Sequence, residues 1–447
     1  MSLSTAAGVL QTELNGSDVD FTGVGTDTRT LKKGNLFFAL RGPNYDGSLF
    51  LAEAASRGAA GAVVSREINS SLPMLHVEDT RVALGSLASY WRQQFELPVI
   101  AVTGSNGKTT VKNMIASILS QSAEGWATEG NLNNDIGVPL TLLKLRHQHK
   151  FAVVEMGMSH RGEVAYLSGL AKPSVAVITN AAQAHIEGLG SVEQVALAKG
   201  EIFGGLRDDG IAVINADDPY HQIWLDLAAP HQVMTFALEA NADVTATFKT
   251  IDSGSLVSIK TKEGKIEMKL PLLGKHNVMN AVTAATASLA GGASLGDIQK
   301  GLEKLKAIAG RLEIKTGISG ARILDDTYNA NPDSVSAGIE VLRESKGERV
   351  LVLGDMGELG EASEDIHRRV GELARRVGVH RLYAIGPLSR HAASAFGKSG
   401  RHFEGHKEAV DALLDVLHSD MTVLVKGSRN MHMEKVVKGI AKRGKTK

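Results

Sequence analysis

The segment AVTGSNGKTT, residues 101–110, contains the residue types of a phosphate-binding loop. Gly104 and Gly107 allow a phosphate to approach the backbone, whose N–H groups can point toward it. Lys108 can reach the β- and γ-phosphates of ATP, and the hydroxyl of Thr109 can bind Mg²⁺. Two residues separate the glycines, whereas the usual motif has four residues between its first glycine and the Gly-Lys pair. The pattern favours an ATP site over a glycine-rich connecting turn.

Two further residues are candidates for a metal site beside this loop. Glu155 ends the apolar segment FAVVE, and a buried carboxylate needs a bound cation or a basic side chain as its partner. His185 follows the next apolar segment, SVAVITN, where it is either a ligand or an ordinary surface residue. Lys199 lies in the helical pattern VALAKGEIF, and its surroundings in the sequence indicate only a solvated lysine.

The elements that must position these residues alternate between strand and helix. PVIAVT, FAVVEM, SVAVITN and GIAVINA predict buried strands, and a helix is predicted to follow from Thr109. This alternation is typical of a parallel sheet covered on both faces, with ligands at the carboxyl ends of its strands. Residues 243–270 alternate differently and predict an antiparallel patch at the sheet edge.

Two other units flank this sheet. The first contains the predicted strands GNLFFAL and AAGAVVS and the predicted helices SLFLAEAASRG and VALGSLASYWRQQF. After Gly310, the segments ARILDD, RVLVLGD, RLYAIG and TVLVKGS predict the strands of a smaller doubly wound unit. We therefore expect an α/β protein of three domains, with boundaries at 1–94, 95–309 and 310–447.

Composition excludes several classes of function. Lysine plus arginine and aspartate plus glutamate both number 49, so the net charge gives no sign of a nucleic-acid partner. The chain has no cysteine, which excludes disulfides and thioester intermediates. The first residues lack the pattern of a secretory signal, and no apolar stretch approaches the ~20 residues that span a bilayer. We expect a cytoplasmic protein without membrane insertion.

Longer motifs resemble those of the Mur ligase family. They are TGSNGKTT, TEGNLNNDIGVPLTLL, EMGMSHRGE, TNAAQAHIEGLGS, AKGEIF, GKHNVMNAVTA, AGRLE, DDTYNANPDS, LGDMGELG and VLVKGSRNMHME. The resemblance extends from TDTRTLKKGNLFFALRG to the C-terminal helix. It implies a small α/β N-terminal domain for a UDP-sugar, a central P-loop parallel-sheet ATPase domain, and a C-terminal Rossmann-like domain for an incoming dipeptide.

The resemblance also implies an activity. The family joins a carboxylate to an amine with ATP, through an acyl phosphate. DDTYNANPDS and LGDMGELG are similar to the member that adds D-alanyl-D-alanine to UDP-N-acetylmuramoyl-tripeptide in peptidoglycan synthesis. On this resemblance we expect a monomer that uses ATP as substrate, Mg²⁺ as cofactor and a carbamylated Lys199.

Carried over to this sequence, the family's roles fall on two sets of residues. The first set binds ATP and metal. For ATP it comprises Gly104, Ser105, Asn106, Gly107, Lys108, Thr109, Thr110, Asn277, Asn280, Arg311 and either Asp325 or Asp326. For metal it comprises Thr109, Glu155, His185 and Lys199. Lys108, His185 and Lys199 would be catalytic.

The second set binds the other substrates. Asp27, Thr28 and Arg29 would contact the UDP-sugar, and Asn133 and Asn134 would lie where the peptidyl carboxylate arrives. The dipeptide would be bound by Tyr328, Asn329 and Asn331, which without the resemblance would read as a turn before a helix.

One residue departs from the family pattern. Ser48, in NYDGSLF, stands where family members commonly have histidine.

Three alternatives stay open. A diamino-acid-adding ligase of the same family would use an Asp-Asn-Pro-Arg segment, which this sequence lacks. A folylpolyglutamate synthase would have its phosphate loop nearer the start of the chain. A nucleotide-gated binding module would need the loop, but neither Lys199 nor the YNANP segment.

Overall fold

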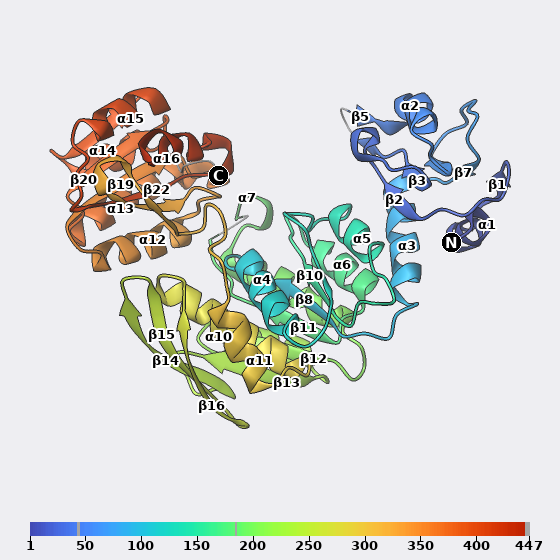
Figure 1. Cartoon of the computed structure of the whole chain (residues 1–447), viewed down its shortest axis with the longest axis horizontal. Helices are drawn as coiled ribbons and strands as arrows, with labels where there is room; N and C mark the ends of the chain where they lie inside the picture. Colours follow the sequence, from blue (N-terminus) through green and yellow to red (C-terminus); the bar gives the residue numbers. More distant parts are fainter. Residues whose placement is uncertain (43–44, 184–185, 443–447) are drawn as a thin grey trace.

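In the part of the chain that the structure describes, three sheets of five or more strands succeed one another and form the two arms and the base of a crescent (Figure 1). The computed structural model describes residues 1–42, 45–183 and 186–442. The first sheet lies in one arm, the largest sheet forms the base, and the third lies in the other arm. This arrangement confirms the predicted three-domain α/β fold, while the boundaries at residues 94 and 309 stay a prediction.

The largest sheet has the order β16-β15-β14-β13-β12-β11-β8-β10-β9. Its strands β8 to β13 are parallel to their neighbours, and β14, β15 and β16 form an antiparallel edge, as predicted. The bounds are β8 Val99–Thr103, β9 Trp126–Ala127, β10 Ala152–Glu155, β11 Val175–Ile178, β12 Ile211–Asn215, β13 Gln232–Ala237, β14 Val244–Ile251, β15 Gly254–Thr261 and β16 Gly264–Leu270.

Helices cover both faces of this sheet because its central strands are apolar on both sides. In β8, Ile100 and Val102 pack in the same core as α4, α10 and α11, whereas Val99 and Ala101 pack in the core that contains α5, α6, α8 and α9. The bounds are α4 Lys108–Leu119, α5 Gly137–Leu142, α6 Glu163–Ala171, α7 Ile186–Leu189, α8 Val192–Gly200, α9 His221–Ala228, α10 Lys275–Ala290 and α11 Leu295–Glu303.

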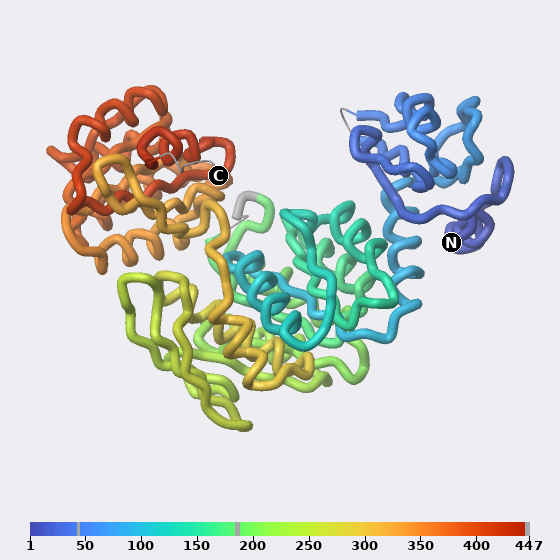
Figure 2. The backbone as a smooth tube through the Cα atoms, viewed as in Figure 1, coloured from blue at the N-terminus to red at the C-terminus, as the bar shows by residue number. Residues whose placement is uncertain are grey.

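The N-terminal sheet has the order β1-β7-β6-β3-β2. Its strands are β1 Leu14–Asn15, β2 Gly23–Gly25, β3 Asn35–Phe38, β6 Gly61–Val64 and β7 Met74–His76, with a separate hairpin of β4 Arg41–Gly42 and β5 Tyr45–Asp46. Its helices are α1 Leu3–Leu10, α2 Leu51–Ser56 and α3 Thr80–Arg92. Because α3 contacts α5 and α6, it joins this arm to the base of the crescent, as the tube in Figure 2 shows.

The C-terminal sheet has the order β17-β18-β22-β19-β20-β21, parallel except for β17 at one edge. Its strands are β17 Glu313–Thr316, β18 Arg322–Asp326, β19 Glu348–Gly354, β20 Arg381–Ile385, β21 Gly400–Phe403 and β22 Met421–Lys426. The helices are α12 Pro332–Glu344, α13 Ser363–Arg376, α14 Arg390–Phe396, α15 His406–Leu414 and α16 Glu434–Ile440. Separate cores on its two faces confirm the doubly wound unit, although β17 and β21 were not predicted.

No helix within the described ranges is both long and apolar enough to cross a bilayer.

Candidate active site

The loop that follows β8 requires glycine at two positions. Gly104 has a φ of +149°, and a Cβ there would lie 1.8 Å from the Thr179 side-chain oxygen. Gly107 has a φ of +84°, and a Cβ there would lie 2.4 Å from Oδ1 of Asn280. Other residues rarely adopt such φ values, and no space exists for a methyl group. The glycines therefore bring the loop backbone close to its surroundings, as a phosphate-binding loop needs.

The two residues that follow β11 hold the loop in position through hydrogen bonds. Ser105 donates its N–H to the carbonyl of Asn180 at 3.0 Å, and Asn106 donates its N–H to Oδ1 of Asn180 at 2.9 Å. The hydroxyl of Thr179 donates to the carbonyl of Asn106 at 2.6 Å. Sequence reasoning did not select Thr179 or Asn180, although both lie at the carboxyl end of the predicted strand SVAVITN.

Lys108 and Glu155 provide opposite charges beside the loop. Nζ of Lys108 donates to the carbonyls of Gly104 at 2.6 Å and Ser105 at 3.2 Å. Removal from water lowers the pKa of Lys108, the charge of Glu155 opposes that effect, and the charge of Arg311 adds to it. The lysine therefore lies at the loop, where it can meet a phosphate.

The Glu155 carboxylate is buried and only partly satisfied. Its Oε1 accepts hydrogen bonds from the Thr109 hydroxyl at 3.2 Å and from Nδ2 of Asn133 at 2.9 Å. Its Oε2 accepts no hydrogen bond and lies 3.7 Å from Nζ of Lys112. The alternative of a basic partner is thus correct in part. The open oxygen and the adjacent hydroxyl are also the hard oxygen ligands that Mg²⁺ prefers, so the residues present fit that ion.

Lys199 lies in the core. It is 1% exposed, and no hydrogen bond or ion pair joins its side-chain amine to another of the residues that the structure describes. Burial lowers its pKa well below the usual value, and the charge of Lys108 lowers it further. The sequence expectation of a solvated lysine is therefore wrong. A neutral amine at neutral pH is the form that can react with CO₂.

The geometry of the second predicted metal site, at His185 and Lys199, cannot be described in the same way. His185 lies outside the described residues. Within the described ranges, no group of three His, Asp or Glu side chains could hold a metal ion.

The cavity at the loop measures ≈ 620 Å³ and lies between the central and C-terminal sheets. Most of the predicted ATP and dipeptide residues line it. They are Ser105, Asn106, Gly107, Lys108, Thr109, Thr110, Asn277, Asn280, Arg311, Asp326, Tyr328, Asn329 and Asn331. Asn133, predicted at the peptidyl carboxylate, and Glu155, predicted as a metal ligand, line it as well.

Three contacts join the C-terminal side of this cavity to the loop side. Nη2 of Arg311 donates to the Thr109 hydroxyl at 3.1 Å, and its guanidinium lies 4.4 Å from the centre of the Tyr328 ring. Nδ2 of Asn331 donates to Oδ1 of Asn106 at 2.8 Å. In addition, Oδ2 of Asp333 accepts the N–H of Gln183 at 3.1 Å.

The wall formed by α10 is polar but buried. Nδ2 of Asn280 donates to Oδ1 of Asn277 at 3.2 Å, and Asn277 donates to the carbonyl of Leu273 at 2.8 Å. His276 also lines the cavity, and burial together with the charge of Lys426 lowers its pKa to about 4. A neutral imidazole and two amides are suited to an uncharged heterocycle such as a base.

Of the two adjacent aspartates, only one reaches the cavity. Successive side chains of a strand point to opposite faces, so Asp325 and Asp326 at the end of β18 diverge. Asp325 accepts from Nζ of Lys315 at 2.5 Å and from the Thr327 hydroxyl at 2.7 Å, away from the cavity. Asp326 accepts from Nζ of Lys426 at 2.6 Å and lines the cavity. Of the two, Asp326 is therefore the one that lies at the cavity.

Comparisons with known proteins agree with this geometry. Residues 20–92 match the Mur ligase family catalytic domain, residues 102–288 the Mur ligase middle domain, and residues 310–429 the Mur ligase glutamate ligase domain. The UDP-N-acetylmuramoyl-tripeptide–D-alanyl-D-alanine ligase of Escherichia coli (strain K12) is 44% identical to this chain and is aligned over 99% of each protein. The chain belongs to the Mur ligase family.

Solved structures of Mur ligases extend the likeness. A crystal structure of MurF from Acinetobacter baumannii superposes with a TM-score of 0.92 at 36% identity, covering 97% of each chain. MurF from Thermotoga maritima in complex with ADP gives a TM-score of 0.84 at 27% identity, covering 93% of this chain and 96% of that one.

A second cavity of this Mur ligase, of ≈ 390 Å³, shares Lys108 and Asn133 with the first. Asn134 lines it as well, and its Oδ1 accepts the N–H of Gly137, the first residue of α5, at 2.9 Å.

The predicted UDP-sugar residues lie in the other arm of the crescent, apart from both cavities (Figure 1). Arg29 forms an ion pair with Asp27 at 2.6 Å, and the Thr28 hydroxyl donates to Oε2 of Glu53 at 3.0 Å. Ser48 donates to Oδ1 of Asp46 at 2.5 Å and accepts from Nη2 of Arg66 at 2.7 Å.

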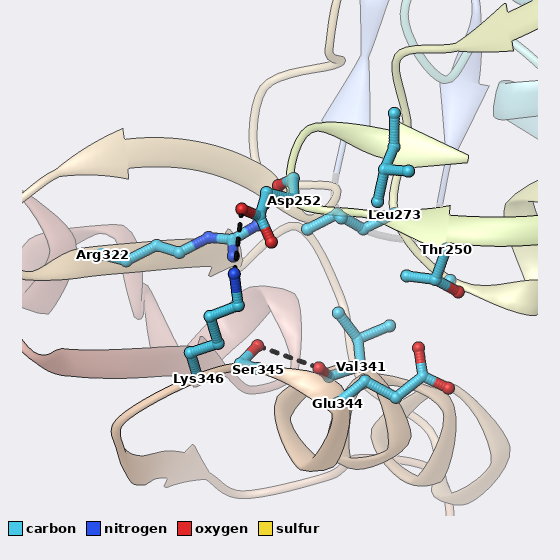
Figure 3. Close-up of a pocket in the computed structure, with 10 residues that line it drawn as sticks. Thr250, Asp252, Leu273, Arg322, Val341, Glu344, Ser345 and Lys346 are labelled. Atoms are coloured by element: carbon cyan, nitrogen blue, oxygen red, sulfur yellow. Dashed lines mark hydrogen bonds and ion pairs between the residues drawn. The ribbon is translucent and has the colours of Figure 1, made fainter. Parts of the chain in front are cut away.

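A third cavity, of ≈ 430 Å³, lies between the β14–β15 turn and the C-terminal sheet (Figure 3). Nη2 of Arg322 donates to the carbonyl of Asp252 at 2.8 Å, and Nζ of Lys346 lies 3.2 Å from Oδ2 of Asp252. None of the predicted site residues lines it, so we regard it as interdomain packing.

Proposed function

We propose that this chain is an ATP-dependent ligase that adds D-alanyl-D-alanine to UDP-N-acetylmuramoyl-tripeptide, through an acyl phosphate. The relative from Escherichia coli that carries this name matches the chain over almost its whole length. The observation that carries the proposal is the ≈ 620 Å³ cavity, because it combines the phosphate loop with the segment predicted for the dipeptide.

The first step brings two anions together. A carboxylate oxygen of the tripeptide attacks the γ-phosphorus of ATP and ADP leaves, which produces the acyl phosphate. Two unit charges ~4 Å apart repel by ~1 kcal/mol in water and ~4 kcal/mol near a protein surface. Lys108, at the loop, and Arg311, 3.1 Å from the Thr109 hydroxyl, supply positive charge where this repulsion arises.

Mg²⁺ would supply further charge neutralisation at the phosphates when bound. Thr109 and Glu155 would hold it, since the Thr109 hydroxyl lies 3.2 Å from Oε1 of Glu155 and Oε2 of Glu155 has no hydrogen bond. A carbamylated Lys199 and His185 would face a second ion. The lowered pKa of Lys199 supports carbamylation, because the neutral amine is the reactive form.

The second step joins the amine of the dipeptide to the acyl carbon, and phosphate leaves from the tetrahedral intermediate. The proposed dipeptide residues are Tyr328, Asn329 and Asn331. They line the same cavity as the phosphate loop, so the amine would be placed beside the acyl phosphate and water would be excluded from it.

The remaining substrate would extend from the second cavity, at Asn133 and Asn134, to the N-terminal arm. There Asp27, Thr28 and Arg29 would contact the UDP-sugar, with Ser48 in place of the usual histidine. The domain boundaries 1–94, 95–309 and 310–447, a cytoplasmic location and a monomeric state belong to the same proposal.

Phosphate release in the presence of different substrates tests the proposal. With Mg²⁺ and ATP, we expect turnover only when both UDP-N-acetylmuramoyl-tripeptide and D-alanyl-D-alanine are present. A requirement for a free diamino acid together with the UDP-dipeptide would instead indicate the sister ligase. ATP hydrolysis that responds to neither acceptor would indicate a binding module.

A further inference from the structure

We propose that Lys426 is a positioning residue, which fixes the nucleotide-facing carboxylate of Asp326 and the dipeptide segment in one arrangement. This inference rests on the proposed function. Lys426 was not selected by sequence reasoning, because it lies 100 residues from Asp326 in the chain and ends a different strand.

The contacts of Lys426 connect two predicted substrate contacts. It is paired in register with Asp326 across the parallel strands β18 and β22. Its Nζ donates to Oδ2 of Asp326 at 2.6 Å and to the carbonyl of Asn329 at 2.9 Å. The Lys426 side chain is 3% exposed, and both of its hydrogen bonds are partly buried. A buried charged donor that serves two acceptors at once is hard to replace.

Asp326 extends this connection to the segment that carries Arg311. Its Oδ1 accepts the N–H of Leu312 at 3.2 Å. The residue before Leu312 is Arg311, which reaches the Thr109 hydroxyl at 3.1 Å. Lys426 also binds the carbonyl of Asn329. Asn329 lies two residues before Asn331, whose side chain contacts Asn106. Lys426 thereby orients both C-terminal contacts to the phosphate loop.

The charge of Lys426 also favours the ionised form of Asp326. Burial raises the pKa of Asp326, whereas Lys426 and then Arg311 lower it. On the side of α10, His276 faces Lys426 and has a pKa of about 4, so it adds no charge at neutral pH. From α12, Gly338 faces Oδ2 of Asp326 without a charged group. Loss of Lys426 therefore favours protonation of Asp326 at a higher pH.

The test compares Lys426→Met with Lys426→Arg in the full chain. For Lys426→Met we expect the KM values of ATP and D-alanyl-D-alanine to rise roughly tenfold or more, since charge-assisted bonds are lost. The acid limb of kcat/KM for ATP should move to higher pH. Lys426→Arg keeps the charge and should leave that limb near its wild-type position.

Lys315→Met is the matched control. Lys315 forms an ion pair at 2.5 Å with Asp325, which lies on β18 next to Asp326 but points to the opposite face of the sheet. Lys315 does not line the cavity. We expect wild-type KM values and an unchanged acid limb for Lys315→Met. Equal effects of the two methionine variants would show a merely structural role for Lys426 and overturn the inference.

Two further measurements cover the remaining outcomes. The affinity for ADP, measured by calorimetry, should fall in Lys426→Met whatever substrates the enzyme joins. If the wild type is inactive with UDP-N-acetylmuramoyl-tripeptide and D-alanyl-D-alanine, that result therefore refutes only the proposed function. If Lys426→Met does not fold, the pair Asp326→Asn and Asp326→Asn/Lys426→Met replaces it. The second substitution should then weaken ADP binding little further, and a full additional loss would contradict action through Asp326.

Discussion

Nδ2 of Asn331 donates to Oδ1 of Asn106 at 2.8 Å, across 225 residues of chain. The same Asn331 side chain caps α12, because its Oδ1 accepts the N–H of Ser334 at 2.9 Å. One amide therefore uses its oxygen to begin a helix of the C-terminal domain and its nitrogen to contact the phosphate loop. This fixes which way the amide points.

The two functions of this amide can be separated by substitution. Asn331→Asp retains a capping oxygen but loses the donor to Asn106, whereas Asn331→Ala loses both. We expect kcat/KM for D-alanyl-D-alanine to fall roughly tenfold in each variant, as for the loss of one hydrogen bond of ~1 kcal/mol or slightly more. Only Asn331→Ala should also lower the melting temperature. Steady-state kinetics and thermal unfolding check this, and wild-type kinetics for Asn331→Asp would contradict it.

The glycine at the start of the loop offers a prediction about stability. Gly104→Ala should destabilise the protein by about 1–3 kcal/mol or more, since a methyl group would lie 1.8 Å from the Thr179 hydroxyl oxygen. It should also weaken ATP binding, because the loop must move. Gly204→Ala is the control, since its Cβ would meet no atom within 4 Å. Urea unfolding and nucleotide titration measure both effects, and equal stability of the two variants would refute the prediction.

The sequence predicted the parts of the site that depend on local pattern. The strand β8, the glycines after it and the following helix lie within one short segment, and the structure has all of them; the helix was predicted from Thr109 and begins at Lys108. Glu155 could be identified as a candidate metal ligand because it ends a buried strand at the same edge of the sheet as the phosphate loop.

Contacts that depend on the packing of distant elements were not predictable. Asp325 and Asp326 could not be distinguished, because strand alternation gives two faces without saying which one meets the cavity. Lys112 and Lys426 gave no local signal, since their carboxylate partners lie on strands that are distant in the sequence. Lys199 was misread as solvated, because the helical pattern does not show that its surroundings are apolar.

The burial of Lys199 predicts a pH-dependent stability. Its pKa is lowered in the folded state, so between that lowered pKa and the unfolded value of ~10.4 the unfolded chain binds more protons. The stability of the wild type should therefore rise with pH in this window. In Lys199→Met that contribution is absent. We expect the melting temperature of the wild type, relative to the variant, to increase from pH 7 to pH 9 in CO₂-free buffer.

An exposed lysine provides the comparison. Lys398→Met should melt in parallel with the wild type across the same pH range, because Lys398 is exposed to solvent. Parallel melting curves for Lys199→Met as well would show that burial of Lys199 does not disfavour its charge.

Carbamylation of Lys199 predicts a response to bicarbonate. Protonation at low pH removes the neutral amine that reacts with CO₂, so wild-type activity should fall there and recover in part when bicarbonate is added at constant pH. Lys199→Ala should lose most activity and gain nothing from bicarbonate. Initial rates at matched ionic strength check both expectations, and full activity of Lys199→Ala would exclude the role.

The central claim is that the tripeptide carboxylate is activated by transfer of the γ-phosphoryl group. Its most direct test uses UDP-N-acetylmuramoyl-tripeptide with ¹⁸O in both oxygens of the reacting carboxylate, together with ATP and D-alanyl-D-alanine. The carboxylate oxygen that attacks phosphorus leaves with it, so mass spectrometry should find one ¹⁸O in each inorganic phosphate and one in the new amide. Label in AMP, or phosphate without label, would contradict an acyl phosphate.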